Sequence, residues 1–234
     1  GLLSAHGARR VDYYNSLPTP EPLHIRGQLG IIFKNRAVIC AALLLGVVEL
    51  VNATSSATSL YYLDAVVGNV TLKSVFSLAT LAISLVFVPM MPAVLKRFGK
   101  QRSVLLGMIL VAIPSVLLMV RRENATVPEI IVWNILGSLG FVMANIGVLA
   151  MIPDCTDYTE WKFGTVQAGF VNSSITFMRQ FAAALPTTIV GVALAAVSYN
   201  TDPDSQAVMD VIINIKILYP FLLLAAAVVL LKLY

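Results

Sequence analysis

Six long apolar runs constrain this chain more than any other feature of its sequence. A helix that crosses a lipid bilayer needs about 20 mostly apolar residues. The six runs are Val38–Leu63, Leu72–Val94, Val104–Val120, Ile130–Ile152, Ala168–Val197 and Val208–Leu231. A closed β-barrel can also span a bilayer, but its strands alternate apolar and polar residues. These runs are apolar all round, so the sequence predicts an all-α membrane protein with six transmembrane helices.

The composition agrees with a lipid environment. Charged residues make up 12% of the 234 residues, and the mean hydropathy is +0.85. Soluble domains carry about 25% charged residues, so much of this surface is expected to face lipid. The net charge of +4 is modest and concentrated between the runs, which argues against nucleic acid as a partner. The chain has two cysteines, which are too few for a disulfide framework and do not form a CxxC metal-binding pair.

The positions of lysine and arginine predict the orientation of the helices. Cytoplasmic connections carry an excess of these residues. If the N-terminus lies in the cytoplasm, the inner segments hold eleven of them and the outer loops hold three. The sequence therefore predicts a multi-pass protein of the plasma (inner) membrane with both ends in the cytoplasm.

The first 36 residues differ in kind from the rest. Proline at every second position of Pro18–Pro22 favours an extended, polyproline-like spacer, and a basic segment follows it. Residues 1–36 are therefore predicted to be a cytoplasmic linker, and residues 37–234 a six-helix bundle. No cleavable signal sequence follows Gly1, so we expect the chain to be a piece of a longer protein.

Two charged residues are predicted to lie at mid-bilayer. Glu49 is eleven residues into the first run, and Arg179 is eleven residues into the fifth. At about 1.5 Å per residue, both lie about 16 Å from the inner face. A charge there costs about 2.5–3.5 kcal/mol on insertion scales, so both are functional candidates that pair or share a water-filled cavity. A purely structural ion pair explains them equally well.

Other features of the runs have simpler explanations. Lys216, eight residues into the last run, and Asp210 are predicted to lie near the outer interface. Small residues on the fourth run predict close helix packing. These are Gly137, Gly140, Ala144 and Gly147.

A short acidic segment, Pro153–Gly164, separates the fourth and fifth runs and is predicted to be a turn-like connector. Asp154, Cys155, Asp157 and Glu160 could ligate a metal, but no histidine lies nearby and the spacing matches no zinc pattern. The favoured interpretation is a cytoplasmic gate, in which these carboxylates exchange basic partners as a carrier opens and closes.

This acidic segment resembles that of the glycoside-pentoside-hexuronide:cation symporters, the melibiose-permease-like branch of the major facilitator superfamily. The family pattern is Asp-x-x-Asp-Tyr-Gly-Glu-Trp/Tyr-Lys-x-Gly. The matching residues are Asp154, Asp157, Tyr158, Glu160, Trp161, Lys162 and Gly164. A second segment is similar to the basic loop that superfamily members place between the second and third helices of each half. Its basic residues are Lys96, Arg97, Lys100 and Arg102.

Such symporters have twelve helices, so the resemblance, which runs from about Ile31 to the end, implies the C-terminal six. It implies a secondary active transporter that moves a glycoside, pentoside or sugar acid together with Na⁺ or H⁺. In such carriers two six-helix halves rock about a midplane site, which is alternating access. The implied partners are the N-terminal half, membrane lipid and a small-molecule substrate. No cofactor is expected, and the coupling ion is expected to bind mainly in the N-terminal half.

The resemblance also implies site residues. Asn145, Thr176 and Gln180 fall at cavity-facing positions, so with Glu49 and Arg179 they are the substrate-binding candidates. The predicted gate sets one group of residues against another. The first group is Asp154, Asp157, Tyr158, Glu160 and Lys162, and the second is Lys96, Arg97, Lys100 and Arg102.

Three departures from the family pattern concern the gate and the site. Val166 and Ala168 stand where the family usually has Arg and Glu, and Gln180 stands where many members carry Lys.

Three other interpretations remain open. One is a lysolipid-type carrier of the same superfamily, and another is a stand-alone half-size protein that dimerises. The third, a membrane-embedded enzyme, is disfavoured because both histidines, His6 and His24, lie in the linker and the chain has no HExxH or GxSxG motif.

Overall fold

The computed structural model describes residues 25–121, 125–164, 168–197 and 206–234, and these residues form helices with no strand among them. The predicted proline spacer, both histidines and Val166 lie outside the described residues. The helices are α3 (Ile25–Lys34), α4 (Arg36–Tyr61), α5 (Leu72–Phe98), α6 (Lys100–Arg121), α7 (Val127–Leu149), α8 (Ile152–Phe163), α9 (Ala168–Ala196) and α10 (Gln206–Leu233). A π-helical turn over Tyr62–Val66 extends α4.

Six of these helical segments are long and apolar enough to cross a membrane. Five of the spans contain a predicted run in full, and the remaining one ends at Ala196, one residue before the predicted end at Val197. The expected all-α membrane class is therefore confirmed. The spans are Arg36–Ala65, Leu72–Phe98, Lys100–Arg121, Val127–Phe163, Ala168–Ala196 and Gln206–Leu233. One difference lies before the first span, where α3 occupies part of the segment predicted to be a linker.

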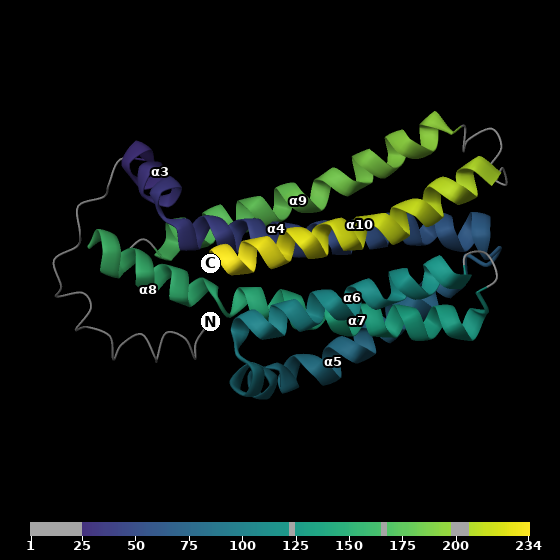
Figure 1. The fold of residues 1–234 in the computed structure, drawn as a ribbon, viewed down its shortest axis with the longest axis horizontal. Coiled ribbons are helices and arrows are strands. Elements are labelled where there is room, and N and C mark those ends of the chain that lie inside the picture. The colour runs from purple at the N-terminus through teal and green to yellow at the C-terminus, as the bar shows by residue number, and fades with distance from the viewer. Residues whose placement is uncertain (1–24, 122–124, 165–167, 198–205) are drawn as a thin grey trace, which may run out of the picture.

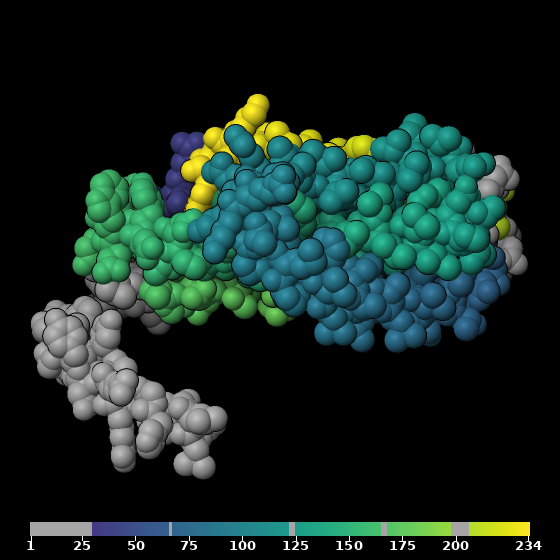
Figure 2. Space-filling model, turned by 90° about the horizontal axis from the view of Figure 1, so that it is seen from below, coloured from purple at the N-terminus to yellow at the C-terminus, as the bar shows by residue number. Residues whose placement is uncertain are grey.

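The α4 helix is the centre of the bundle and the most buried of the six spans. It packs against α9 and α10, while α7 packs against α6 and α5, and α10 joins the two groups by packing on α6 (Figure 1). The α5 helix lies at the outside of the bundle and is the least buried of the six spans. In Figure 2 it lies on the surface that faces the viewer. The beginning of α4, the short helix α8 and the end of α10 all lie at one end of the bundle (Figure 1).

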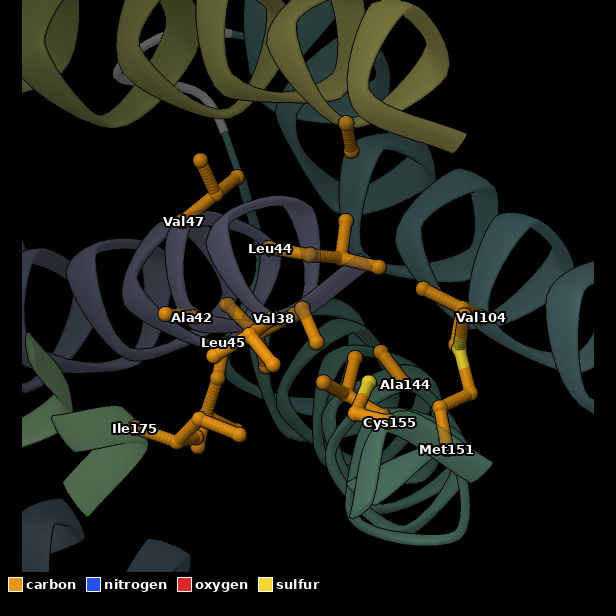
Figure 3. Packing of buried hydrophobic residues seen from close by; sticks show 14 of the residues in the cluster. Val38, Ala42, Leu44, Leu45, Val47, Val104, Ala144, Met151, Cys155 and Ile175 are labelled. Atoms are coloured by element: carbon orange, nitrogen blue, oxygen red, sulfur yellow. The ribbon is translucent and has the colours of Figure 1, made fainter. Parts of the chain in front are cut away.

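Each end of the bundle has its own apolar core. The core at the α8 end includes Leu44 and Leu45 of α4, Met151 before α8 and Ile175 of α9, all almost fully buried (Figure 3). The core at the opposite end contains a different set of residues. It includes Tyr62, Leu63, Phe76, Leu118, Leu194 and Ile212. The cavity described below lies where the two cores meet, and residues of both cores line it.

Two connections differ from the sequence-based expectation. The predicted basic loop is a tight junction: Lys96 and Arg97 end α5, Lys100 begins α6, and Gly99 between them has φ 80°. Glycine adopts this backbone conformation without steric cost. The acidic segment, predicted to be a turn-like connector, is instead the helix α8.

Glycines bring α6 and α7 into backbone contact. A Cβ added to Gly140 would lie 2.6 Å from the Gly107 carbonyl oxygen and 2.7 Å from the Val111 nitrogen. Both are backbone atoms, which cannot rotate away as a side chain can. Close approach through small residues is a common way for membrane helices to associate, since lipid removes the hydrophobic drive between them. The small residues that the sequence singled out on α7 therefore do allow close packing.

We expect Gly140→Ala to destabilise the protein, because the added methyl group must force α6 and α7 apart. Overpacking of this kind costs about 1–3 kcal/mol. The matched control is Gly137→Ala, one turn earlier on the same helix, whose new Cβ would lie 3.7 Å from Pro114, an ordinary contact. Thermal unfolding in detergent should show a lower Tm for the first variant alone. Equal Tm values for the two variants would contradict this account of the α6–α7 contact.

Candidate functional site

A buried carboxylate joins three helices near the middle of the bundle. Glu49 of α4 is 5% exposed, and its Oε1 accepts a bond of 2.6 Å from the Arg179 Nε of α9. The same oxygen accepts a second bond, of 3.2 Å, from the Asn145 Nδ2 of α7. A buried charge is tolerated when it is paired and hydrogen-bonded. Glu49 therefore fixes the relative positions of α4, α7 and α9.

The two members of this ion pair differ in their surroundings. The Glu49 side chain is 6% exposed, whereas that of Arg179 is 43% exposed. A guanidinium has five N–H donors, and within the described residues only the Nε–H of Arg179 is bound to Glu49. The exposed part of Arg179 can therefore bind a further acceptor without breaking the ion pair.

Two other substrate-binding candidates lie near this cluster without joining it. Thr176 and Gln180 are exposed on α9 and, four residues apart, lie on one face of the helix. Within the described residues neither contacts Glu49 or Asn145. The structure therefore brings together Glu49, Asn145 and Arg179 and leaves the other two on the open surface beside them.

At the α8 end, one ion pair connects the predicted acidic and basic segments. Lys100 Nζ, at the start of α6, lies 2.6 and 2.7 Å from the two Asp154 carboxylate oxygens at the start of α8. Both side chains are about half exposed. Solvent weakens such a pair, which is worth about 0–1 kcal/mol.

The remaining gate candidates make local contacts or none. Lys162 donates to the Tyr158 hydroxyl at 3.3 Å, a contact within α8. Over the ranges that the structure describes, several gate candidates form no ion pair. These are Lys96, Arg97, Arg102, Asp157 and Glu160. Among the nine predicted gate residues, Lys100 and Asp154 therefore form the one ion pair that joins the basic and acidic segments within the described residues.

The α8 helix is held by residues that the sequence reasoning missed. Pro153 in the first turn and Gly164 with φ 65° after the last turn are the usual signals of a helix start and stop. Buried Asn35 caps α4, and its Nδ2 also donates to the Thr159 hydroxyl of α8 at 2.7 Å. Asparagine before an apolar run is a readable cap signal, but no local signal points to a partner 124 residues away.

A second polar region lies between the two apolar cores. A cavity of about 540 Å³ is lined by residues of α4, α5, α6, α7 and α10, among them Lys216. Lys216, which was predicted to lie near the outer interface, lines this cavity, and its ammonium lies 4.6 Å from the centre of the Tyr62 ring. None of Glu49, Asn145 and Arg179 lines this cavity.

Comparison with known proteins places these features in a family. The model of the MFS/sugar transport protein family matches residues 2–234. The isoprimeverose transporter of Lactiplantibacillus pentosus is 30% identical over 69% of this chain and 34% of that protein. Putative sulfoquinovose importers of Escherichia coli and Salmonella typhimurium are 28% and 30% identical, over 80% and 61% of this chain.

The chain spans well under half the length of these relatives, since the matches cover 30–40% of each. The family match extends over almost the whole chain and agrees with the resemblance to melibiose-permease-like symporters. This multi-pass membrane chain therefore belongs to the MFS/sugar transport protein family of the major facilitator superfamily.

Proposed function

We propose that this chain is the C-terminal half of a secondary active transporter, a symporter of a glycoside, pentoside or sugar acid with Na⁺ or H⁺. The observation that carries the proposal is the ion pair of Glu49 with Arg179, near the middle of two membrane helices and open on one side. The N-terminal half, membrane lipid and the coupling ion are its partners, the ion being bound mainly by the other half. No cofactor and no catalysis are part of the proposal.

The unequal exposure of the pair supports a site for a solute. Enclosing both charges of an ion pair carries a desolvation cost that can exceed their attraction, so stability alone is a weak explanation for such a pair. Here Arg179 is exposed on α9, and an arginine charge facing lipid at this depth is costly. Its exposed face is better explained by a water-filled cavity between this half and the N-terminal half. Thr176 and Gln180, on neighbouring positions of α9, would line the same cavity.

Binding and movement can be coupled through this cluster. Substrate hydroxyls or carboxylates would accept from the free N–H groups of Arg179, while Glu49 and Asn145 hold the guanidinium in place. Because one oxygen of Glu49 binds both α7 and α9, a shift of α9 changes its contact with α4. Rocking of the two halves would then expose the site to each side in turn.

The ion pair of Lys100 and Asp154 suits an inner latch. It is weak enough to break in each cycle because both groups reach solvent. The other gate candidates, including Asp157 and Glu160, would meet basic residues of the opposite half or in another state. In this proposal the α8 end faces the cytoplasm, both chain ends lie there, and the membrane is the plasma (inner) membrane.

A lysolipid carrier is the second candidate, and one observation favours it. An apolar groove of about 530 Å³ lies between α4, α9 and α10 and could hold an acyl chain. Its walls include Leu50, Met178, Phe181 and Leu185. A stand-alone half-size protein that dimerises would use the same exposed α9 face against a second copy.

We expect the single variants Glu49→Gln and Arg179→Gln to lose both stability and sugar uptake, since each leaves one charge unpaired. Breaking a buried pair in this way costs about 3–5 kcal/mol. The double variant Glu49→Gln/Arg179→Gln removes both charges and should regain most of the Tm, but not the uptake. The measurements are thermal unfolding and uptake of labelled glycosides by the complete carrier in proteoliposomes. Normal uptake by the double variant would show that the pair only joins helices.

We expect Lys100→Ala to slow uptake while changing the free energy of unfolding by less than about 1 kcal/mol. The exchanged variant Lys100→Asp/Asp154→Lys restores the pair and should recover part of the rate. The control is Lys34→Ala, an exposed lysine at the end of α3 that is not a gate candidate and forms no ion pair within the described residues. Uptake rates in cells, normalised to the amount of protein in the membrane, are the test. A Lys100→Ala rate equal to that of the control would argue against a latch.

A further inference from the structure

The polar cavity between the two cores is a second place where a solute could bind. Its volume of about 540 Å³ falls within the range of about 300–1,000 Å³ that is typical of small-molecule sites. Val51 of α4 and Phe141 of α7 line it, two and four residues from Glu49 and Asn145 respectively. The cavity thus begins directly beyond the Glu49 cluster, toward the core of Tyr62 and Ile212.

The charged residues that line this cavity are all positive within the described part of the chain. Lys73 and Lys216 are the charged residues among its lining residues, and no carboxylate is among them. Lys216 Nζ contacts the Tyr62 ring, and Lys73 Nζ donates to the Ser56 carbonyl at 3.5 Å. Lysine at membrane depth usually pairs with an acidic group. Neither lysine has an acidic partner within the described residues, so an anion would satisfy both.

The rest of the wall suits a molecule with many hydroxyl groups. Asn134 Oδ1 and Thr54 Oγ1 are buried and have no hydrogen-bonding partner among the described residues, and both residues line the cavity. Leaving such a buried group unpaired is unfavourable, and a sugar hydroxyl can donate to each. Further hydroxyl groups surround the space. They belong to Ser55, Ser59, Ser77, Ser84, Ser115 and Ser138.

We propose that this cavity binds the charged end of an anionic sugar, a carboxylate or sulfonate, and that Lys216 is the residue that recognises the charge. The inference rests on the proposed transport function and names its substrate class. An ammonium has three N–H donors, and contact with the face of Tyr62 leaves them available to the anion. Lys73 adds a second positive charge. Asn134 and Thr54 accept from the sugar hydroxyls.

The position of the cavity favours a sugar over a lipid that carries the same anionic group. A lysolipid needs a long apolar surface next to its headgroup. The apolar groove of this chain lies between α4, α9 and α10, and none of its lining residues is shared with the cavity. The cavity is lined by both polar and apolar side chains, and Trp133 and Phe76 can pack on the carbon skeleton of a sugar ring.

The test uses the complete carrier in phosphatidylcholine proteoliposomes and two sugars that differ only in charge, methyl glucuronoside and methyl glucoside. Lys216→Met removes the ammonium but keeps a long side chain. We expect it to raise the half-saturating concentration of the glucuronoside roughly 10- to 100-fold, the usual effect of losing a charged hydrogen bond. Uptake of the glucoside should change less than about twofold. Lys216→Arg should keep most of the glucuronoside affinity, and the control Lys232→Met, at the inner end of α10, should change neither sugar.

Each other outcome overturns the inference. Equal losses for both sugars would assign Lys216 a structural role, and no loss for either would remove it from the site. Lys216-dependent uptake of lysophosphatidylglycerol, without glucuronoside uptake, would assign the anion to a lipid. If the carrier takes up the glucoside and Lys216→Met has no effect, the proposed function stands and this inference fails. If the carrier takes up neither sugar, the proposed function fails. The binding site is then tested separately by the thermal shift of the purified protein with glucuronoside, which should be lost in Lys216→Met.

Discussion

The cost of placing charge away from water is the constraint on which the rest of this structure depends. An unpaired carboxylate near the middle of a membrane helix is strongly unfavourable, so Glu49 is stable there only with its partners. Those partners come from two other helices, Arg179 from α9 and Asn145 from α7. One buried oxygen therefore determines how three helices meet.

The bundle is consequently organised in layers along its length. Two apolar cores lie toward the ends, and the serine-rich cavity lies where they meet. Glu49 lies among residues of the first core, and Lys216 lies among residues of the second. Apolar cores without polar groups would give a more stable bundle, since each buried polar group must be satisfied. Retaining two unsatisfied buried atoms among the described residues, Thr54 Oγ1 and Asn134 Oδ1, is easier to explain in a protein that exchanges a polar solute than in one that only spans a membrane.

The sequence predicted the helices and the meeting of Glu49 with Arg179, because hydropathy and helical rise depend only on residue counts along one run. It did not predict α8, since Pro153 and Gly164 are typical both of a connector and of a capped short helix. The bond from Asn35 to Thr159 fixes α8, and such a distant pair leaves no local pattern. The cavity beside Lys216 was not predicted either, because its position in the last run does not show which neighbouring helices enclose a space there. The roles of Thr176 and Gln180 stay predictions.

The exposed surface of α9 combines apolar side chains with the charged side chain of Arg179. Apolar residues such as Phe177 and Ile189 are exposed on this helix, and lipid alone could cover them. Arg179 is exposed on the same helix, and lipid is a poor environment for a guanidinium at this depth. A surface that is both strongly apolar and locally charged fits an interface with another protein surface that encloses water. In the proposed carrier α9 would face the N-terminal half, whereas the uncharged apolar surface of α5 between Leu78 and Met90 would meet lipid.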